Sequence, residues 1–203
     1  MISNYWVITA AHCTPTSLER GHIFAGGHIL RDMREADTYI INSMYRHPKW
    51  NHPDLFDNDI GLVSVKKSII MRGSVLPVCL PHAKTCFKEQ TQCVTTGWGL
   101  TSERGEFPDK LQEVAVEIFK KDDCTNLAGY GHVKDTAICA GYHDGRKDAC
   151  SGDSGGPLVC RLEAPYTGAW VLYGIVSWGY GCARPGNPGV YTSVKSYSDW
   201  IEK

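Results

Sequence analysis

The stretch DACSGDSGGPLVC, residues 148–160, carries the strongest chemical signal in the sequence. Ser154 stands in a glycine-rich turn that would present its hydroxyl with little steric cover, and Gly152 would let backbone N–H groups converge on one point. A serine hydroxyl is a weak nucleophile, so it needs a base within hydrogen-bond reach and a carboxylate that orients the base. Taken by itself, the stretch fits a solvated glycine turn about as well as a catalytic one.

Two other stretches could supply the base and the carboxylate. His12 follows an apolar run in VITAAHC (residues 7–13), and Asp59 precedes another in DNDIGL (residues 57–62). Each has a structural alternative, because a histidine on an apolar strand is often a hydrogen-bonded core residue and an aspartate before a strand is often a turn residue. Spacing alone does not join the three side chains, since many Ser, His and Asp residues would fit equally well.

Size and composition restrict the possible classes of protein. The 203 residues, 42% of them apolar, suffice to bury a core as one domain or two small subdomains. A net charge of −1 gives no reason to expect a nucleic acid or a membrane surface as partner. No run approaches the roughly 18 apolar residues of a membrane span, and residues 1–13 lack the basic start of a signal peptide.

Short β-rich runs alternate with Gly, Pro, Asn and Asp along the whole chain, which favours an all-β sandwich or barrel. The expected strands are 5–9, 38–44, 60–65, 93–98, 111–119, 157–160, 170–178 and 189–194. Residues 193–203 place Val194, Tyr197 and Ile201 at helical spacing and predict a short C-terminal helix. The segment 100–110 is the expected junction between an N-terminal and a C-terminal half.

The nine cysteines show no C-x-x-C spacing, which argues against a zinc ribbon or a thioredoxin motif. A disulfide framework is the better interpretation, and it predicts a secreted, extracellular protein. Nine is odd, so at least one thiol lacks a partner within this chain.

Taken together and in order, VITAAHC, DNDIGL and GDSGGP resemble the three signatures of chymotrypsin-type (trypsin-like) serine proteases. The resemblance extends to LPVCLP (76–81), CVTTGWG (93–99), AICAG (137–141), SWGYGC (177–182) and PGVYTSV (188–194). It implies two antiparallel Greek-key β-barrels and a short C-terminal α-helix within one domain, 1–203. Residues 1–99 would form an N-terminal barrel that lacks its first strands, and 110–203 the second barrel and the helix.

The resemblance also implies the role of each catalytic residue. Ser154 attacks the scissile carbonyl, His12 takes its proton and returns it to the leaving amine, and Asp59 orients the imidazole. The backbone N–H groups of Gly152 and Ser154 form the oxyanion hole. The expected activity is that of a serine endopeptidase that works through an acyl-enzyme intermediate.

Specificity follows from the same alignment of motifs. Asp148, six residues before Ser154, matches the base of the primary pocket, where a carboxylate favours a substrate cation. Gly179 and Gly189 match two wall positions without side chains, and Ser177, Trp178 and Gly179 match the strand that pairs with the substrate backbone. The prediction is cleavage after Arg or Lys, with protein substrates and protein protease inhibitors as partners.

The resemblance pairs Cys93 with Cys160, Cys124 with Cys139, and Cys150 with Cys182. It matches Cys79 to a cysteine that tethers a propeptide or light chain in many members, whereas Cys13 would pair upstream and Cys86 matches nothing. Family members are made as zymogens, and the ammonium freed by activation pairs with the residue that Asp153 matches.

No segment of this chain matches the activating sequence, and an unpaired buried carboxylate is costly. We therefore expect Asp153 to turn outward and leave the oxyanion hole unformed. On the same ground we expect this chain to be a fragment of low activity.

Several other interpretations are weaker. A catalytically inactive homologue that acts as a binding module is the main alternative, but the presence of His12, Asp59, Gly152 and Ser154 favours an enzyme. An α/β-hydrolase would carry its histidine after the G-x-S-x-G serine, whereas His12 precedes Ser154.

We expect no cofactor and no metal. A calcium loop over 27–37, ending at Asp37, would need a carboxylate where Gly27 stands, and HPKWNH (47–52) fits a solvated loop.

Overall fold

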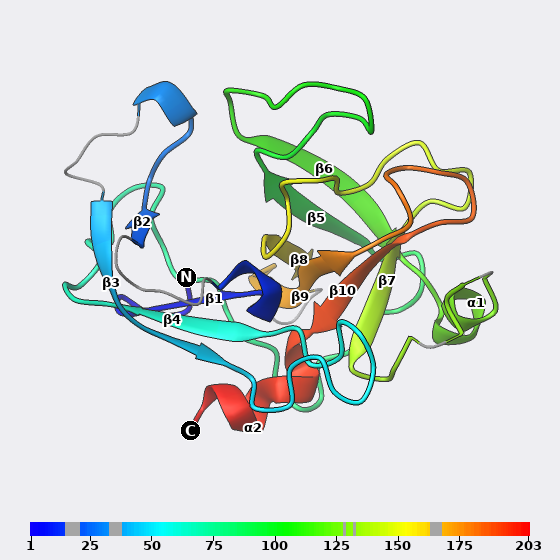
Figure 1. Ribbon diagram of the computed structural model, residues 1–203, viewed down its shortest axis with the longest axis horizontal. Coiled ribbons are helices and arrows are strands. Elements are labelled where there is room, and N and C mark those ends of the chain that lie inside the picture. The colour runs from blue at the N-terminus through cyan, green and yellow to red at the C-terminus, as the bar shows by residue number, and fades with distance from the viewer. Residues whose placement is uncertain (15–20, 33–37, 128, 132, 163–167) are drawn as a thin grey trace.

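Two antiparallel β-sheets lie side by side in the computed structural model of the chain (Figure 1). The structure describes residues 1–14, 21–32, 38–127, 129–131, 133–162 and 168–203. The first sheet has four strands, and the second closes into a barrel of six. This arrangement confirms the expected all-β fold with an incomplete first barrel.

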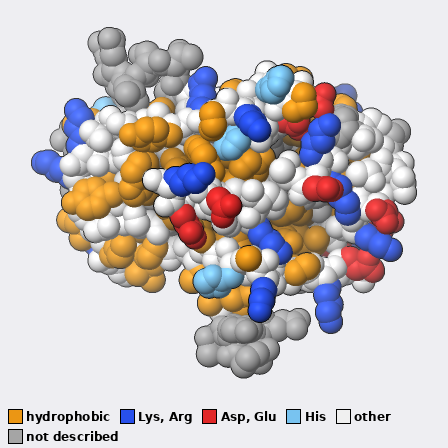
Figure 2. Space-filling view, turned by 90° about the horizontal axis from the view of Figure 1, so that it is seen from below, with side chains coloured by type: hydrophobic (Ala, Val, Ile, Leu, Met, Phe, Trp, Pro, Cys, Tyr) orange, Lys and Arg blue, Asp and Glu red, His pale blue; other side chains and the backbone are white. Residues whose placement is uncertain are grey.

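The first sheet is open. It consists of β1 (Trp6–Thr9), β2 (His22–Phe24), β3 (Thr38–Arg46) and β4 (Gly61–Val65), in the order β1-β4-β3-β2. An open sheet covers its apolar face less completely than a closed barrel does, and Phe24, Ile40 and Tyr45 are each about half exposed. Figure 2 shows hydrophobic side chains gathered on the first-sheet side of one face of the molecule.

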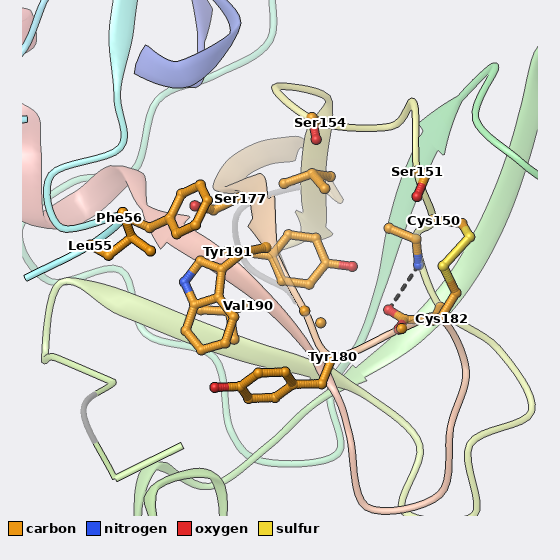
Figure 3. A pocket seen from close by; sticks show the side chains of 17 residues that line it. Leu55, Phe56, Cys150, Ser151, Ser154, Ser177, Tyr180, Cys182, Val190 and Tyr191 are labelled. Atoms are coloured by element: carbon orange, nitrogen blue, oxygen red, sulfur yellow. Dashed lines mark hydrogen bonds between the residues drawn. A yellow bond between two sulfur atoms is a disulfide. The ribbon is translucent and has the colours of Figure 1, made fainter. Parts of the chain in front are cut away.

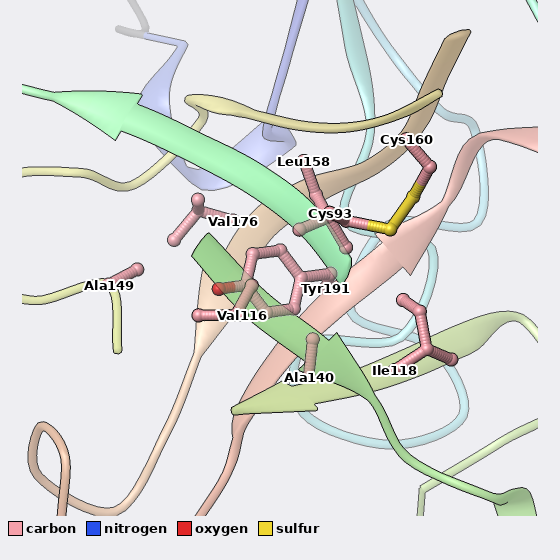
Figure 4. Close-up of a cluster of buried hydrophobic side chains, with 9 residues drawn as sticks. All are labelled: Cys93, Val116, Ile118, Ala140, Ala149, Leu158, Cys160, Val176 and Tyr191. Carbon is pink, nitrogen blue, oxygen red and sulfur yellow. A yellow bond between two sulfur atoms is a disulfide. The ribbon is translucent and has the colours of Figure 1, made fainter. Parts of the chain in front are cut away.

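The barrel provides the larger core. Its strands are β5 (Gln92–Gly97), β6 (Gln112–Ile118), β7 (Ala137–Gly141), β8 (Pro157–Arg161), β9 (Trp170–Trp178) and β10 (Gly189–Ser193), in the closed order β10-β7-β6-β5-β8-β9. Val116, Leu158 and Tyr191 fill the interior next to the Cys93–Cys160 disulfide (Figure 4). Burying a side chain such as Leu158 contributes about 1.5–3 kcal/mol. This core holds the strands and turns that line the pocket described below.

The chain passes from the first sheet to the barrel before Gln92, because β5 pairs with β6 and β8. This crossover comes earlier than the predicted junction at 100–110. Strand pairing in the barrel joins segments that are far apart in the sequence, so the pattern of turn residues does not reveal where the barrel begins.

The helices of the described residues are short. They are the 3₁₀ segments η1 (Ala11–Cys13), η2 (Leu30–Asp32) and η4 (Val194–Tyr197), and the α-helices α1 (Lys121–Thr125) and α2 (Ser198–Ile201). Among the described residues no helix has the length and apolar character needed to cross a membrane.

The C-terminal segment η4–α2 joins the two sheets. Val194 and Tyr197 are buried and Ile201 packs beside them, as the helical spacing predicts. Their cluster also contains Ala10 and Ile60, which lie close in sequence to His12 and Asp59. Packing between the sheets therefore positions these two polar residues.

Candidate active site

Asp59 is fully buried, and its carboxylate accepts three hydrogen bonds. Oδ1 accepts the His12 backbone N–H at 3.0 Å. Oδ2 lies 2.7 Å from His12 Nδ1 and accepts the Ser177 hydroxyl at 2.6 Å. Charge-assisted bonds of this kind compensate for the lost hydration of a buried carboxylate. The imidazole is thereby held with Nδ1 toward Asp59 and Nε2 left for another partner.

The environment of His12 favours its protonated form. The bond to Asp59 is the largest cause of a raised His12 pKa, and the neighbouring Cys13 thiol adds to it, while partial burial works in the opposite direction. Phe56 contacts the imidazole edge-on, with ring centres 5.8 Å apart, and Trp50 lies near the same ring. These aromatic rings reduce the access of water to the His12–Asp59 pair.

Ser154 stands in the turn before β8, next to the segment that carries His12. Gly152 and Gly155 on either side have φ of +97° and +76°, so the turn needs glycine at both positions. The Thr9 hydroxyl donates to the Gly155 carbonyl at 3.4 Å. Among the described residues no hydrogen bond joins Ser154 Oγ to His12, and such bonds are often long before substrate binds. The structure therefore brings all three expected residues to one region.

A pocket of about 430 Å³ opens beside Ser154 (Figure 3). The residues expected from the sequence that line it are Asp148, Ser154, Ser177, Trp178, Gly179 and Gly189. In Figure 3, Leu55 and Phe56 lie on one side and the Cys150–Cys182 disulfide on the other. Leu55, Phe56, Tyr180 and Tyr191 also line the pocket, although none of them is among the site residues expected from the sequence. The only feature of the sequence that indicates Leu55 and Phe56 is their position shortly before Asp59.

Asp148 lines this pocket and is partly buried. Its Oδ1 accepts the Ala149 N–H at 2.8 Å, and its Oδ2 accepts the Ala183 N–H at 3.1 Å. Burial is the main cause of a raised pKa, which reaches about 7, although the two backbone bonds oppose the shift. Within the described part of the chain no basic side chain forms an ion pair with it. A buried carboxylate without a cation is suited to bind one.

The pocket walls are bare where glycine stands. A Cβ atom at Gly189 would lie 2.7 Å from Asp148 Oδ1, so any side chain there would collide with the carboxylate. A Cβ at Gly179 would make only ordinary van der Waals contacts, the nearest at 3.5 Å. Neither position places a side chain in the pocket that Asp148 lines.

Comparison with known proteins agrees with this geometry. A family model described as Trypsin matches residues 1–201. The chain belongs to the trypsin family of serine proteases. It is 38% identical over 202 residues to trypsin-1 of Salmo salar, an alignment that covers 99% of this chain and 77% of the relative. Trypsin-1 of Astacus astacus is 40% identical over 209 residues, covering 97% and 82%, and serine protease 1 of Rattus norvegicus is 39% identical over 205 residues, covering 100% and 77%.

Asp153 of this trypsin-family chain does not take the expected outward position. Its Oδ1 accepts the Gly99 N–H at 2.8 Å, and its Oδ2 accepts the Cys150 N–H at 2.9 Å. Gly97 and Gly99 leave the space that the carboxylate occupies, since a Cβ at either position would overlap it. Two backbone donors thus compensate for the partly buried charge, and neither donor is apparent from the sequence.

The cysteines of this trypsin-family chain form three disulfides, Cys93–Cys160, Cys124–Cys139 and Cys150–Cys182, which are the pairs that the resemblance implies. Cys13, Cys79 and Cys86 are exposed free thiols. In the segment 47–52, Pro48, Lys49, Asn51 and His52 are exposed, as a solvated loop requires, while His47 packs edge-on against Tyr197 and Trp200. Asp37, at the far end of the rejected calcium loop, lies outside the described residues.

Proposed function

We propose that this protein is a serine endopeptidase that cleaves peptide bonds after Arg or Lys. The observation that carries the proposal is Asp148, a partly buried carboxylate without a cationic partner among the described residues, in the pocket that Ser154 also lines. A substrate guanidinium or ammonium would supply the missing charge and hold the ionised form of Asp148. The glycines at 179 and 189 leave room for a long side chain.

The proposed chemistry begins when His12 Nε2 takes the Ser154 hydroxyl proton. Ser154 Oγ then bonds to the scissile carbonyl carbon, and the carbonyl electrons move onto oxygen, where the Gly152 and Ser154 N–H groups donate to it. Asp59 holds the imidazole through Nδ1 and stabilises the imidazolium. His12 returns the proton to the leaving amine as the C–N bond breaks, which leaves an acyl-enzyme. Water attacks this ester with the same base and releases the acid and Ser154.

Further parts of the site are assigned by the same proposal. The segment Ser177–Gly179, at the end of β9, would pair with the substrate backbone as an added strand. Asp153 would be the activation-linked carboxylate, since it borders a cavity of about 360 Å³ beside Asp148. An ammonium group that entered this cavity could take the place of one of the backbone N–H groups that donate to Asp153.

We also propose the compartment in which the protein works and the partners that it binds. The three disulfides favour an oxidising, extracellular compartment. Protein substrates with Arg or Lys before the scissile bond, and protein inhibitors that present the same side chains, fit the pocket. Cys79 is exposed and free, as a cysteine that tethers a propeptide or light chain would be before it is joined.

The alternative is an inactive homologue that only binds such chains. The observation that favours it is the missing hydrogen bond between Ser154 and His12 among the described residues. A fluorophosphonate probe separates the two, because it labels a serine only where a base activates it. Labelling of wild type that is abolished in Ser154→Ala supports the enzyme, and an unlabelled wild type supports the binding module.

The pocket assignment is tested with matched Arg, Lys and Phe peptide substrates. Asp148→Asn is expected to lower kcat/KM for Arg by about 100-fold or more, because a buried charge pair is lost. Asp144→Asn is the control, since Asp144 belongs to the same polar run but is 65% exposed. A wild type that prefers Phe would refute the assignment. The expected low activity of this 203-residue chain stays a prediction that the same assay measures.

A further inference from the structure

Glu103 connects two loops that lie far apart in the sequence. It belongs to the segment 100–110, and its carboxylate contacts the turn between β9 and β10. Glu103 Oε1 accepts the Cys182 backbone N–H at 2.7 Å and the Arg184 Nε–H at 2.5 Å. Oε2 accepts Arg184 Nη2–H at 2.9 Å, so the guanidinium and the carboxylate form a bidentate pair of hydrogen bonds.

The backbone that these contacts hold is strained. Ala183, between the two residues that Glu103 binds, has φ of +54°. Only glycine adopts this left-handed region freely, so a residue with a Cβ needs surrounding contacts to stay there. Gly181 completes the arrangement, because a Cβ at this position would overlap the Glu103 carboxylate and the Arg184 guanidinium.

Ala183 in this conformation directs its N–H toward Asp148. The N–H donates to Asp148 Oδ2 at 3.1 Å, while the N–H of the preceding residue, Cys182, goes to Glu103. The Cys150–Cys182 disulfide anchors the same turn from the other side. Two consecutive backbone donors therefore connect Glu103, which does not line the pocket, to Asp148, which does.

We propose that Glu103 is a positioning residue for the cation pocket. Its hydrogen bonds with Cys182 and Arg184 hold the turn whose Ala183 N–H stabilises ionised Asp148. The proposal rests on the proposed role of Asp148 as the carboxylate that binds Arg or Lys. It adds the segment 100–110 to the parts of the chain that set affinity for a substrate cation.

Apart from Glu103 and its partner Arg184, the charged and titratable groups around Asp148 are the same in wild type and in Glu103 variants. Asp153, Tyr130 and Tyr191 interact with Asp148 electrostatically, and Arg146 and Lys147 line the neighbouring cavity. Loss of the Glu103 charge and release of the Arg184 cation would each favour ionised Asp148 and lower the pH midpoint. A rise of the midpoint in a Glu103 variant therefore reports on loss of the Ala183 donor.

The test measures binding of benzamidine, a planar aromatic amidinium, to the 203-residue chain by calorimetry from pH 6 to 9, which requires no turnover. Glu103→Ala is expected to weaken binding by about threefold to tenfold, the range of a partly exposed charged contact. The pH midpoint of binding is expected to rise, because ionised Asp148 loses support from Ala183. Glu103→Gln keeps an acceptor for the Cys182 N–H, so it is expected to weaken binding less.

Glu106→Ala is the matched control, an exposed carboxylate removed from the same loop, and it is expected to leave affinity and midpoint unchanged. Equal affinity, within twofold, and an equal midpoint in Glu103→Ala and Glu106→Ala would overturn the proposal. If Glu103→Ala does not fold, Arg184→Ala and Glu103→Gln replace it, and wild-type behaviour in both would overturn the proposal.

Asp148→Asn in the same assay separates this proposal from the proposed function. Loss of benzamidine binding in Asp148→Asn, together with unchanged Glu103 variants, refutes only the role of Glu103. A wild type that does not bind benzamidine, or an Asp148→Asn variant that binds it equally well, refutes the assignment of the pocket and the role of Glu103 with it.

Discussion

Replacing Asp148 with Asn is expected to make the stability of the fold less dependent on pH. Burial raises the pKa of Asp148 from its ordinary 3.8 to about 7. Because the folded pKa lies above the unfolded one, the stabilising contribution of this group is fully present below about pH 4 and is lost as pH rises toward 7. The ionised carboxylate then costs about 4 kcal/mol of unfolding free energy at pH 8, of which about 2.5 kcal/mol is lost between pH 5 and pH 8.

The Asn variant has no charge to bury, so its own stability does not fall in this way. Its amide can accept only one of the N–H groups of Ala149 and Ala183, a cost of about 1–3 kcal/mol that is the same at every pH. The informative quantity is therefore the difference in unfolding free energy between variant and wild type. We expect this difference to rise in favour of the variant by about 2.5 kcal/mol from pH 5 to pH 8.

Urea unfolding followed by tryptophan fluorescence at pH 5, 6, 7 and 8, with the disulfides intact, measures this difference. Asp144→Asn serves as the control, because it removes an exposed carboxylate from the same polar run. A difference between Asp148→Asn and wild type that is constant within about 0.5 kcal/mol over this range would refute the reasoning, since a buried, unpaired carboxylate must reveal its ionisation.

Three further predictions concern the neighbouring parts of the site. Asp59→Asn removes the largest cause of the raised His12 pKa, so the imidazole is expected to deprotonate at lower pH in an NMR titration, and kcat is expected to fall about 100-fold or more; an unchanged titration contradicts the assigned pair. Removing the Cys150–Cys182 bond, which spans 32 residues, is expected to lower the unfolding free energy by about 3–4 kcal/mol in thermal or urea unfolding, and a loss below 1 kcal/mol would argue against it. Gly155→Ala is expected to lower the unfolding free energy by about 2 kcal/mol or more in the same assay, because Gly155 combines a positive φ with close contacts. Gly186 has a positive φ but open space around it, so Gly186→Ala is expected to cost only about 1 kcal/mol. Equal losses in the two variants would contradict the role of the contacts.

The secondary structure could be read from the sequence where strands are long and bounded by turn residues. The predicted strand 170–178 coincides with β9 (Trp170–Trp178), and 38–44 falls within β3 (Thr38–Arg46). The short β2 (His22–Phe24) was missed, because three residues carry too little periodicity to be recognised. The motif stretches, which are contiguous in sequence, identified the family and the residues worth examining.

Tertiary structure alone decided how these residues meet. His12 and Asp59 are 47 positions apart, and Ser177 and Asp59 are 118 apart, yet one buried carboxylate binds both. The pocket residues Leu55 and Phe56, the two backbone donors to Asp153 and the grip of Glu103 on Arg184 have no local sequence pattern. The physical reason is that local patterns determine which residue types form a strand or a turn, whereas burial, hydrogen-bond partners and pKa depend on which distant segments pack together.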